Sequence, residues 1–141
     1  MMTLAEQLTE EAYAQDIDVI VEPLPVRGTD ALFVRFEHKA FILLNSPRTQ
    51  AQHACWLAEE LGHYSTAPCR VLNYKSPDDF KTEARARRWA HDRALPPKRI
   101  TEAIDLGART IYEAAEYLGV TEEFFIEAWN DYESRGIGLA K

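Results

Sequence analysis

The feature that most constrains the fold is a change in hydrophobic period at Asn45. Between Ile17 and Asn45, apolar residues alternate or form short continuous runs, which proline, glycine and charged residues separate. Such segments are typical of β-strands. After Asn45, apolar residues recur mainly at three- and four-residue spacing, which is typical of amphipathic helices. A small sheet followed by a helical region predicts an α+β fold.

One helix and three strands are expected in the N-terminal part. Residues 3–15 place apolar side chains near helical spacing and predict a short amphipathic helix. Strands are expected over residues 17–21, 32–36 and 39–45, the last of which is a continuous apolar run. Because the connections between the strands are tight, we expect antiparallel pairing of consecutive strands.

Five helices are expected after the sheet. Ser46 and Pro47 predict a helix start, a hydroxyl N-cap followed by proline, for a helix that ends at about Tyr64. The same signal at Ser76-Pro77 predicts a helix over residues 78–93. Three further helices, each followed closely by a glycine, are predicted over residues 98–106, 110–118 and 121–134.

Size and composition fit one domain, residues 1–141, with a sheet and two long helices in 1–95 and a helical part in 96–141. The 141 residues are 46% hydrophobic and 28% charged, which is ordinary for a globular chain. The net charge of −7 disfavours non-specific binding to nucleic acid or membranes. The chain has two cysteines, no basic and apolar leader, and no apolar run of about 20 residues, so we expect a cytoplasmic location.

The residues that carry candidate chemistry lie on the first two long helices. Glu59 and His63 are four residues apart, so they share a helical face and can reach one ion. Glu60 follows directly, as the general base does in a metalloprotease helix. On the next helix, Glu83 shares a face with Phe80 and several alanines. A carboxylate on a packing face needs a partner, and a metal ion is one such partner.

These residues are part of a wider resemblance. The ELGHY helix, Glu83-Ala84, Trp89-Ala90 and the Leu95-Pro96 stop resemble the ImmA/IrrE-type zinc metallo-endopeptidases, which phages and mobile elements often encode beside a repressor. The likeness covers about residues 10–135. It implies a zincin-like minimal domain that cleaves a protein substrate, a prophage helix-turn-helix repressor. By the same analogy, residues 32–36 form an edge strand that binds extended substrate. The implied zinc ligands are Glu59, His63 and Glu83, with Glu60 as the catalytic base.

The sequence departs from this family at the first ligand. The usual motif is His-Glu-x-x-His, and Glu59 stands where the first histidine is expected. A ligand set of one histidine and two glutamates is harder and more anionic, so it favours zinc less decisively and admits other divalent metals. Without a cation, the converging carboxylates would repel, and at least one would take a proton. We therefore expect either a bound metal or carboxylates that point apart.

Two other functions stay open. A catalytically silent ImmA/IrrE-like protein would bind a repressor or a toxin–antitoxin partner without cutting it. Residues 110–129 also look like a helix-turn-helix, which would make the chain a DNA-binding regulator. However, residues 110–141 carry seven acidic and two basic side chains, which would repel phosphate, so no direct nucleic-acid contact is expected. In the simplest alternative, Glu59, Glu60 and Glu83 are solvated helix residues.

Other conspicuous residues have plain structural interpretations. Gly62 either weakens its helix or permits close approach of the neighbouring strand. His53 is expected on the helix surface and Cys55 as a buried small residue. The arginine-rich stretch 85–93 is expected to be a solvated face, a surface for an acidic partner, or an internal counter-charge for Glu83.

Overall fold

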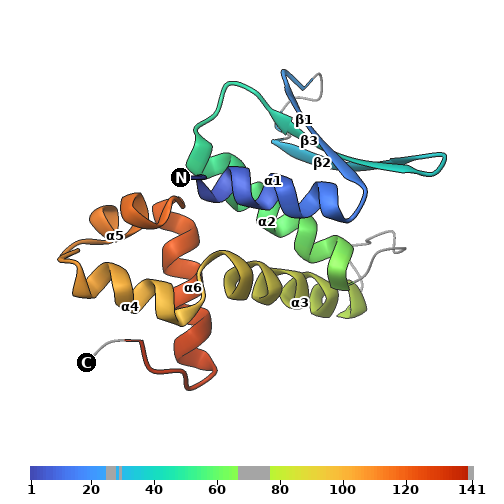
Figure 1. Cartoon of the computed structure of the whole chain (residues 1–141). Coiled ribbons are helices and arrows are strands. Elements are labelled where there is room, and N and C mark those ends of the chain that lie inside the picture. The colour runs from blue at the N-terminus through green and yellow to red at the C-terminus, as the bar shows by residue number, and fades with distance from the viewer. Residues whose placement is uncertain (25–27, 29, 67–76, 140–141) are drawn as a thin grey trace.

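The structure is a computed structural model that describes residues 1–24, 28, 30–66 and 77–139. Within them the α+β expectation is confirmed: an N-terminal helix and a three-stranded sheet precede a helical remainder (Figure 1). The N-terminal elements are α1 (Leu4–Ala14), β1 (Ile17–Glu22), β2 (Ala31–Phe36) and β3 (Lys39–Asn45). The later helices are α2 (Gln50–Thr66), α3 (Pro77–Ala94), α4 (Pro97–Asp105), α5 (Ile111–Leu118) and α6 (Glu122–Ser134).

The strand order β1-β3-β2 places the most apolar strand in the middle of the sheet. β2 pairs with β3 antiparallel, as expected from the tight turn between them. β1 pairs with β3 in parallel and does not neighbour β2, so the expected antiparallel pairing of the first two strands was wrong. The reason is burial: β3 alternates buried Ala40, Ile42 and Leu44 with half-buried residues, and a strand apolar on both faces favours a central position.

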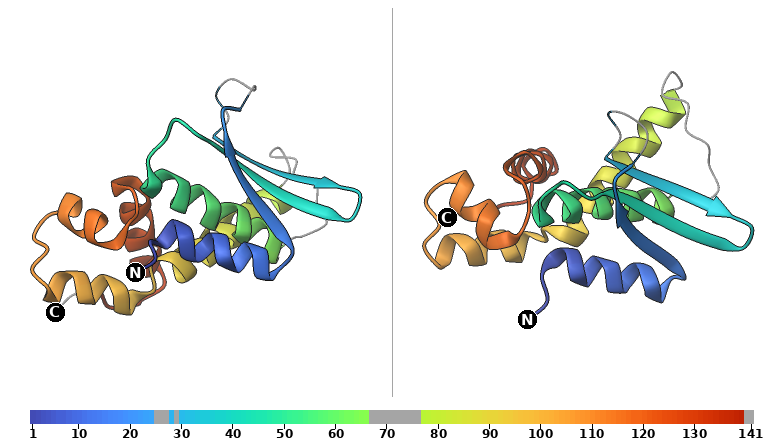
Figure 2. Two further views of the ribbon diagram at one scale, coloured as in Figure 1. Left: turned by 45° about the horizontal axis from the view of Figure 1, so that its top comes forward. Right: turned by 90° about the horizontal axis from the view of Figure 1, so that it is seen from above.

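Helix α2 forms the centre of the fold. The sheet and α1 pack against it on one side and α3 packs on the other, as the views in Figures 1 and 2 agree. The core between these layers contains fully buried side chains from four elements: Leu8, Ile17, Ile42, Leu57 and Leu61. Full burial of a side chain of this size contributes roughly 1.5–3 kcal/mol. The core therefore fixes the helix that carries most of the candidate site.

The start of α2 differs from the expected one. Thr49 caps the helix: its Oγ1 accepts the Gln52 N–H at 3.1 Å, and Gln52 Oε1 accepts the Thr49 N–H at 3.0 Å. The expected start at Ser46 and Pro47 was wrong, because the Ser46 N–H instead donates to the Glu22 carbonyl at 3.1 Å and extends the sheet. The cap formed by Thr49 and Gln52 satisfies two backbone donors, so a helix start at Thr49 is favoured over one at Ser46 and Pro47.

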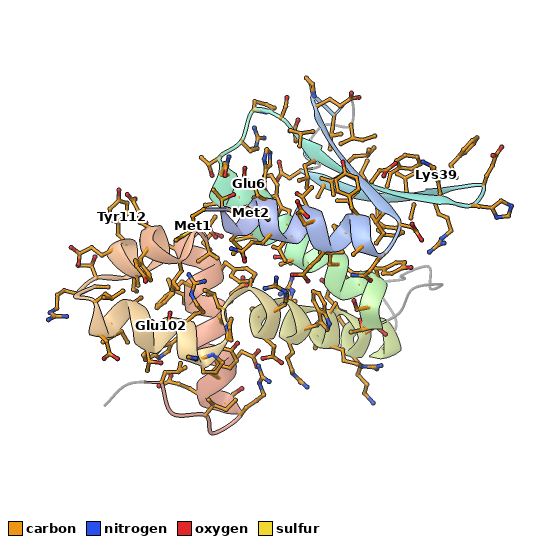
Figure 3. The ribbon with its side chains drawn as sticks, viewed as in Figure 1. Met1, Met2, Glu6, Lys39, Glu102 and Tyr112 are labelled. Carbon is orange, nitrogen blue, oxygen red and sulfur yellow. The ribbon has the colours of Figure 1, made fainter. Side chains whose placement is uncertain are left out.

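The C-terminal helices follow their sequence signals closely. Thr110 and Glu113 form the expected capping box of α5, and Gly119 ends that helix with a φ of 77°. Thr121 caps α6 by accepting the Phe124 N–H at 3.1 Å. Figure 3 shows labelled Glu102 and Tyr112 in this helical half, with labelled Lys39 at the far end of the sheet. No helix in the described ranges has the length and apolarity needed to cross a bilayer.

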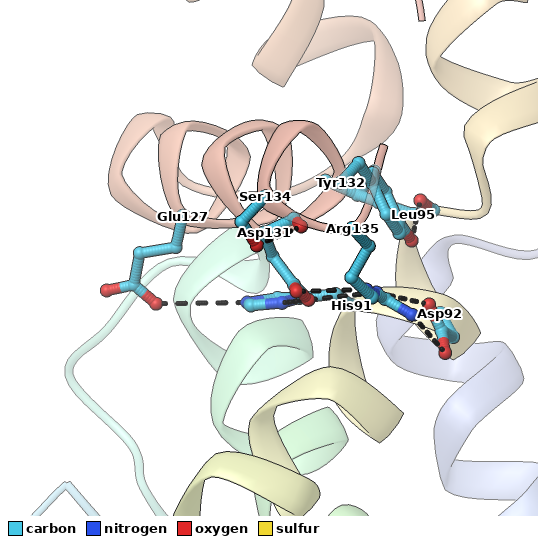
Figure 4. A network of polar contacts seen from close by, with 8 residues as sticks. All are labelled: His91, Asp92, Leu95, Glu127, Asp131, Tyr132, Ser134 and Arg135. Carbon is cyan, nitrogen blue, oxygen red and sulfur yellow. Dashed lines mark hydrogen bonds and ion pairs between the residues drawn. The ribbon is translucent and has the colours of Figure 1, made fainter. Parts of the chain in front are cut away.

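Polar contacts fasten α6 to the end of α3 (Figure 4). Buried His91 lies with Nδ1 2.7 Å from Asp131 Oδ2, and the Tyr132 hydroxyl donates to the Leu95 carbonyl at 2.7 Å. Arg135 donates to both Asp131 and Asp92. His91 therefore joins the two helices.

Candidate metal site

The site begins with a close contact between α2 and α3. A Cβ on buried Gly62 would lie 2.4 Å from the Ala86 carbonyl oxygen, so only glycine permits this spacing. The neighbour that requires glycine is thus a helix, and the expected strand was wrong. Ala86, Ala90 and Ala94 are buried on α3 as expected, whereas Phe80 is 59% exposed and does not belong to the packed face.

This contact brings His63 and Glu83 together. His63 Nε2 lies 3.3 Å from Glu83 Oε2, and the two side chains are 23% and 20% exposed. Glu83 Oε2 is itself buried and has no hydrogen-bond donor among the described residues. A buried carboxylate oxygen without a donor is unfavourable, so each such oxygen needs an explanation. Here the oxygen is available to a cation that the imidazole can also reach.

Glu59 and Glu60 are half-buried on the same helix as His63. Burial raises the pKa of Glu59 to about 7, with Arg87 opposing this shift and Glu127 and Glu83 adding to it. Burial also raises the pKa of Glu60 to about 7, and the charges of Glu59 and Glu83 contribute. Burial is the main cause of both shifts, and repulsion between the acidic side chains adds to it.

The structure places the four predicted site residues in one region but does not assemble a complete ligand set. His63 and Glu83 are adjacent, but no three His, Cys, Asp or Glu side chains within the described residues are grouped closely enough to hold an ion. Glu59 instead borders a cavity of about 280 Å³ together with Cys55 and Glu127. The three-ligand set, and the catalytic role of Glu60, stay predictions.

The fold and this geometry can be compared with known proteins. A peptidase family model described as the IrrE N-terminal-like domain matches residues 12–130. The chain belongs to this family. Comparison with curated proteins and with solved structures gives no significant match. Membership supports a metallopeptidase-like domain and suggests a metal, without identifying which one.

Two further charged residues, Arg87 and Glu127, lie near the candidate site of this IrrE N-terminal-like domain. Arg87 Nε lies 3.5 Å from Glu83 Oε1, so this arginine is a counter-charge for Glu83 as one expectation had it. Arg85, Arg87 and Arg88 are also exposed, which agrees with the expected solvated face. The negative charge of Glu127 on α6 raises the pKa of Glu59. Glu127 was not identified from the sequence as part of the site. No local pattern marks Glu127, because only the packing of α6 brings it near a residue 68 positions earlier in the chain.

The remaining candidates of the IrrE N-terminal-like domain have structural roles. Cys55 is buried and free, and its Sγ accepts the Thr121 N–H at 3.5 Å, which confirms the expected packing role. His53 is half-buried on α2, and its Nε2 lies 2.7 Å from the Asn45 carbonyl oxygen, a contact that links the helix to the end of β3. The second cysteine, Cys69, lies outside the described residues.

The raised pKa values predict how the stability of the metal-free domain depends on pH. Glu59 and Glu60 bind protons more tightly when folded, with pKa values of about 7 against an ordinary 4.5. The folded state therefore holds more protons between these values, and stability should fall as pH rises from about 4.5 to about 7. Thermal unfolding of chelator-treated protein between pH 5 and 8 measures this. The double variant Glu59→Gln, Glu60→Gln should lose the part of the slope that these groups cause, and an unchanged slope would contradict the prediction.

Proposed function

We propose that this domain is a metal-dependent endopeptidase whose ion, most simply zinc, is held by His63, Glu83 and Glu59. The observation that carries the proposal is the buried Oε2 of Glu83, which has no hydrogen-bond donor among the described residues and lies 3.3 Å from His63 Nε2. An imidazole nitrogen and carboxylate oxygens are donor types of catalytic zinc sites, which keep three protein ligands and one open position. The donor types of these residues therefore suit such an ion, and the second carboxylate of the set also suits manganese or iron.

Glu60 is the residue we assign to proton transfer. A bound divalent ion would supply an acidified water and polarise the substrate carbonyl. Glu60 takes the proton of the attacking water and passes it to the amine that leaves. Its position directly after Glu59 matches the place of the base in a metalloprotease helix.

The proposed substrate is a protein, namely a prophage or mobile-element helix-turn-helix repressor in the cytoplasm. Family resemblance supports the repressor, and the edge strand β2 supports an extended peptide as the bound form. β2 pairs with β3 on one side, and within the described residues no strand pairs with its other side. Backbone groups on such an edge can add a substrate strand. Exposed Glu116, Glu122 and Glu123 on α5 and α6 oppose a direct role in DNA binding.

A silent binding protein is the second candidate. Glu59 replaces the first histidine of the family motif, and this replacement favours loss of zinc affinity. The same fold would then hold a repressor or toxin–antitoxin partner by surface contacts alone.

Metal content separates the two candidates. Protein purified without chelators is expected to contain one equivalent of metal by elemental analysis. His63→Ala and Glu83→Ala should each lower the affinity by more than about 100-fold, beyond the usual effect of losing an outer-shell partner. His38→Ala, which changes an exposed histidine in the β2–β3 turn, is the matched control and should keep the metal. If the wild type contains no metal and its melting temperature does not change when a chelator is added, the catalytically silent binding protein is favoured.

A further inference from the structure

Arg87 is the basic side chain that approaches the candidate site most directly in the described part of the chain. It lies one turn after Glu83 on α3, with Nε 3.5 Å from Glu83 Oε1. Its charge also lowers the pKa of Glu59 on α2, against the larger effect of burial. Arg87 therefore acts on two carboxylates, from two helices, that the proposed function assigns to the ion.

The two oxygens of Glu83 have different surroundings. Oε1 faces Arg87, whereas Oε2 is buried and faces His63. In the metal-free chain the guanidinium supplies a permanent positive charge beside Glu83 Oε1. Arginine keeps its charge at any pH a protein tolerates. Its guanidinium therefore stays positively charged when a divalent ion binds nearby.

We propose that Arg87 is a resident counter-ion of this site, which pairs with Glu83 in the metal-free chain and competes with the divalent ion for it. The inference rests on the proposed function, because it needs Glu83 and Glu59 to be ligands. Arg87 is 54% exposed, so its guanidinium can move toward solvent without disturbing the buried face of α3. Arg87 is thus a positioning residue that sets metal affinity and does not react with substrate.

The sign of the effect distinguishes this role from the opposite one. If Arg87 competes with the ion, its removal strengthens metal binding, because one repulsion and one rival partner disappear. If Arg87 instead orients Glu83 for the ion, its removal weakens binding, as loss of an outer-shell partner does. Since the pair is partly exposed, solvent screens it, and we expect a change on the order of tenfold.

The test is a zinc titration of the full chain against a chromophoric chelator, after the metal has been stripped. Arg87→Met and Arg87→Gln should bind zinc about tenfold more tightly than wild type. Arg87→Lys, which keeps the charge, should stay closer to wild type. Arg88→Met is the matched control: it removes the same charge from an exposed neighbour rotated by about 100° around α3, and should change affinity less than twofold. Circular dichroism confirms that each variant is folded.

The outcomes separate this inference from the proposed function. If wild type binds zinc and both neutral variants bind it equally or more weakly, the competition is overturned and the endopeptidase proposal stands. If neither wild type nor the neutral variants bind zinc, both are overturned. If zinc binds detectably only after Arg87 is replaced, both are supported, and the arginine is what holds the affinity down.

Discussion

Glu60→Gln is expected to lower the rate of peptide cleavage by about 10²- to 10⁴-fold, the usual contribution of a general base. The amide keeps the size of the side chain but cannot accept a proton from water. Bound metal should be unchanged, because Glu60 is not among the assigned ligands. Cleavage is measured by co-expressing the proposed substrate, a helix-turn-helix repressor, and following its fragments, with elemental analysis of the same preparations.

The exposed residue Glu133 on α6 offers a matched control for this experiment. Glu133→Gln makes the same chemical change away from the site and should leave cleavage and metal content unaltered. Persistent cleavage in Glu60→Gln would show that another group takes the proton. If metal and activity disappear together, Glu60 would be a ligand, and the roles of Glu59 and Glu60 would have to be exchanged.

Gly62→Ala is expected to destabilise the domain by about 1–3 kcal/mol, the usual cost of forcing an extra methyl group into a packed interior. Its Cβ would lie 2.4 Å from the backbone oxygen of Ala86, which no side-chain rotation can relieve. The clash outweighs the gain of about 1 kcal/mol that alanine normally brings to a helix. Because His63 is the next residue, the forced separation of α2 and α3 should also weaken metal binding.

Denaturant unfolding measures the first effect and zinc titration the second. Gly138→Ala is the control, since Gly138 has a non-positive φ and a Cβ there would meet nothing within 4 Å. That variant should unfold at nearly the wild-type midpoint. Equal stability of Gly62→Ala and wild type would mean that α2 and α3 tolerate a wider spacing than the structure shows.

Local signals predicted most of the secondary structure because each element carries its own period and caps. Thr110 with Glu113, and Thr121 before α6, identify helix starts without any tertiary information. Where two signals overlap, local reasoning fails: Ser46-Pro47 and Thr49 both mark a start, and only the hydrogen bond of Ser46 to the sheet decides between them. Strand order is a property of the assembled sheet, so the parallel pairing of β1 with β3 could not be read from either strand alone.

The same distinction applies to the candidate site. His63 and Glu83 were predicted from spacing and from a helical face, and the structure brings them to 3.3 Å. Arg87 lay in a run of similar arginines, where nothing in the sequence shows which of them turns toward the carboxylates. The position of Glu127 near Glu59 depends on how α6 packs in the fold. Local spacing thus predicts contacts within and between neighbouring helices, and distant electrostatic partners require the fold.

The attachment of α6 to α3 has a consequence for how the candidate site can be disturbed from a distance. Tyr132 and Asp131 brace the end of the helix that carries Glu83. A change that loosens α6 would remove this brace and would leave α3 with fewer contacts to hold it against α2. The position of Glu83 therefore depends on residues that are not themselves assigned to the ion.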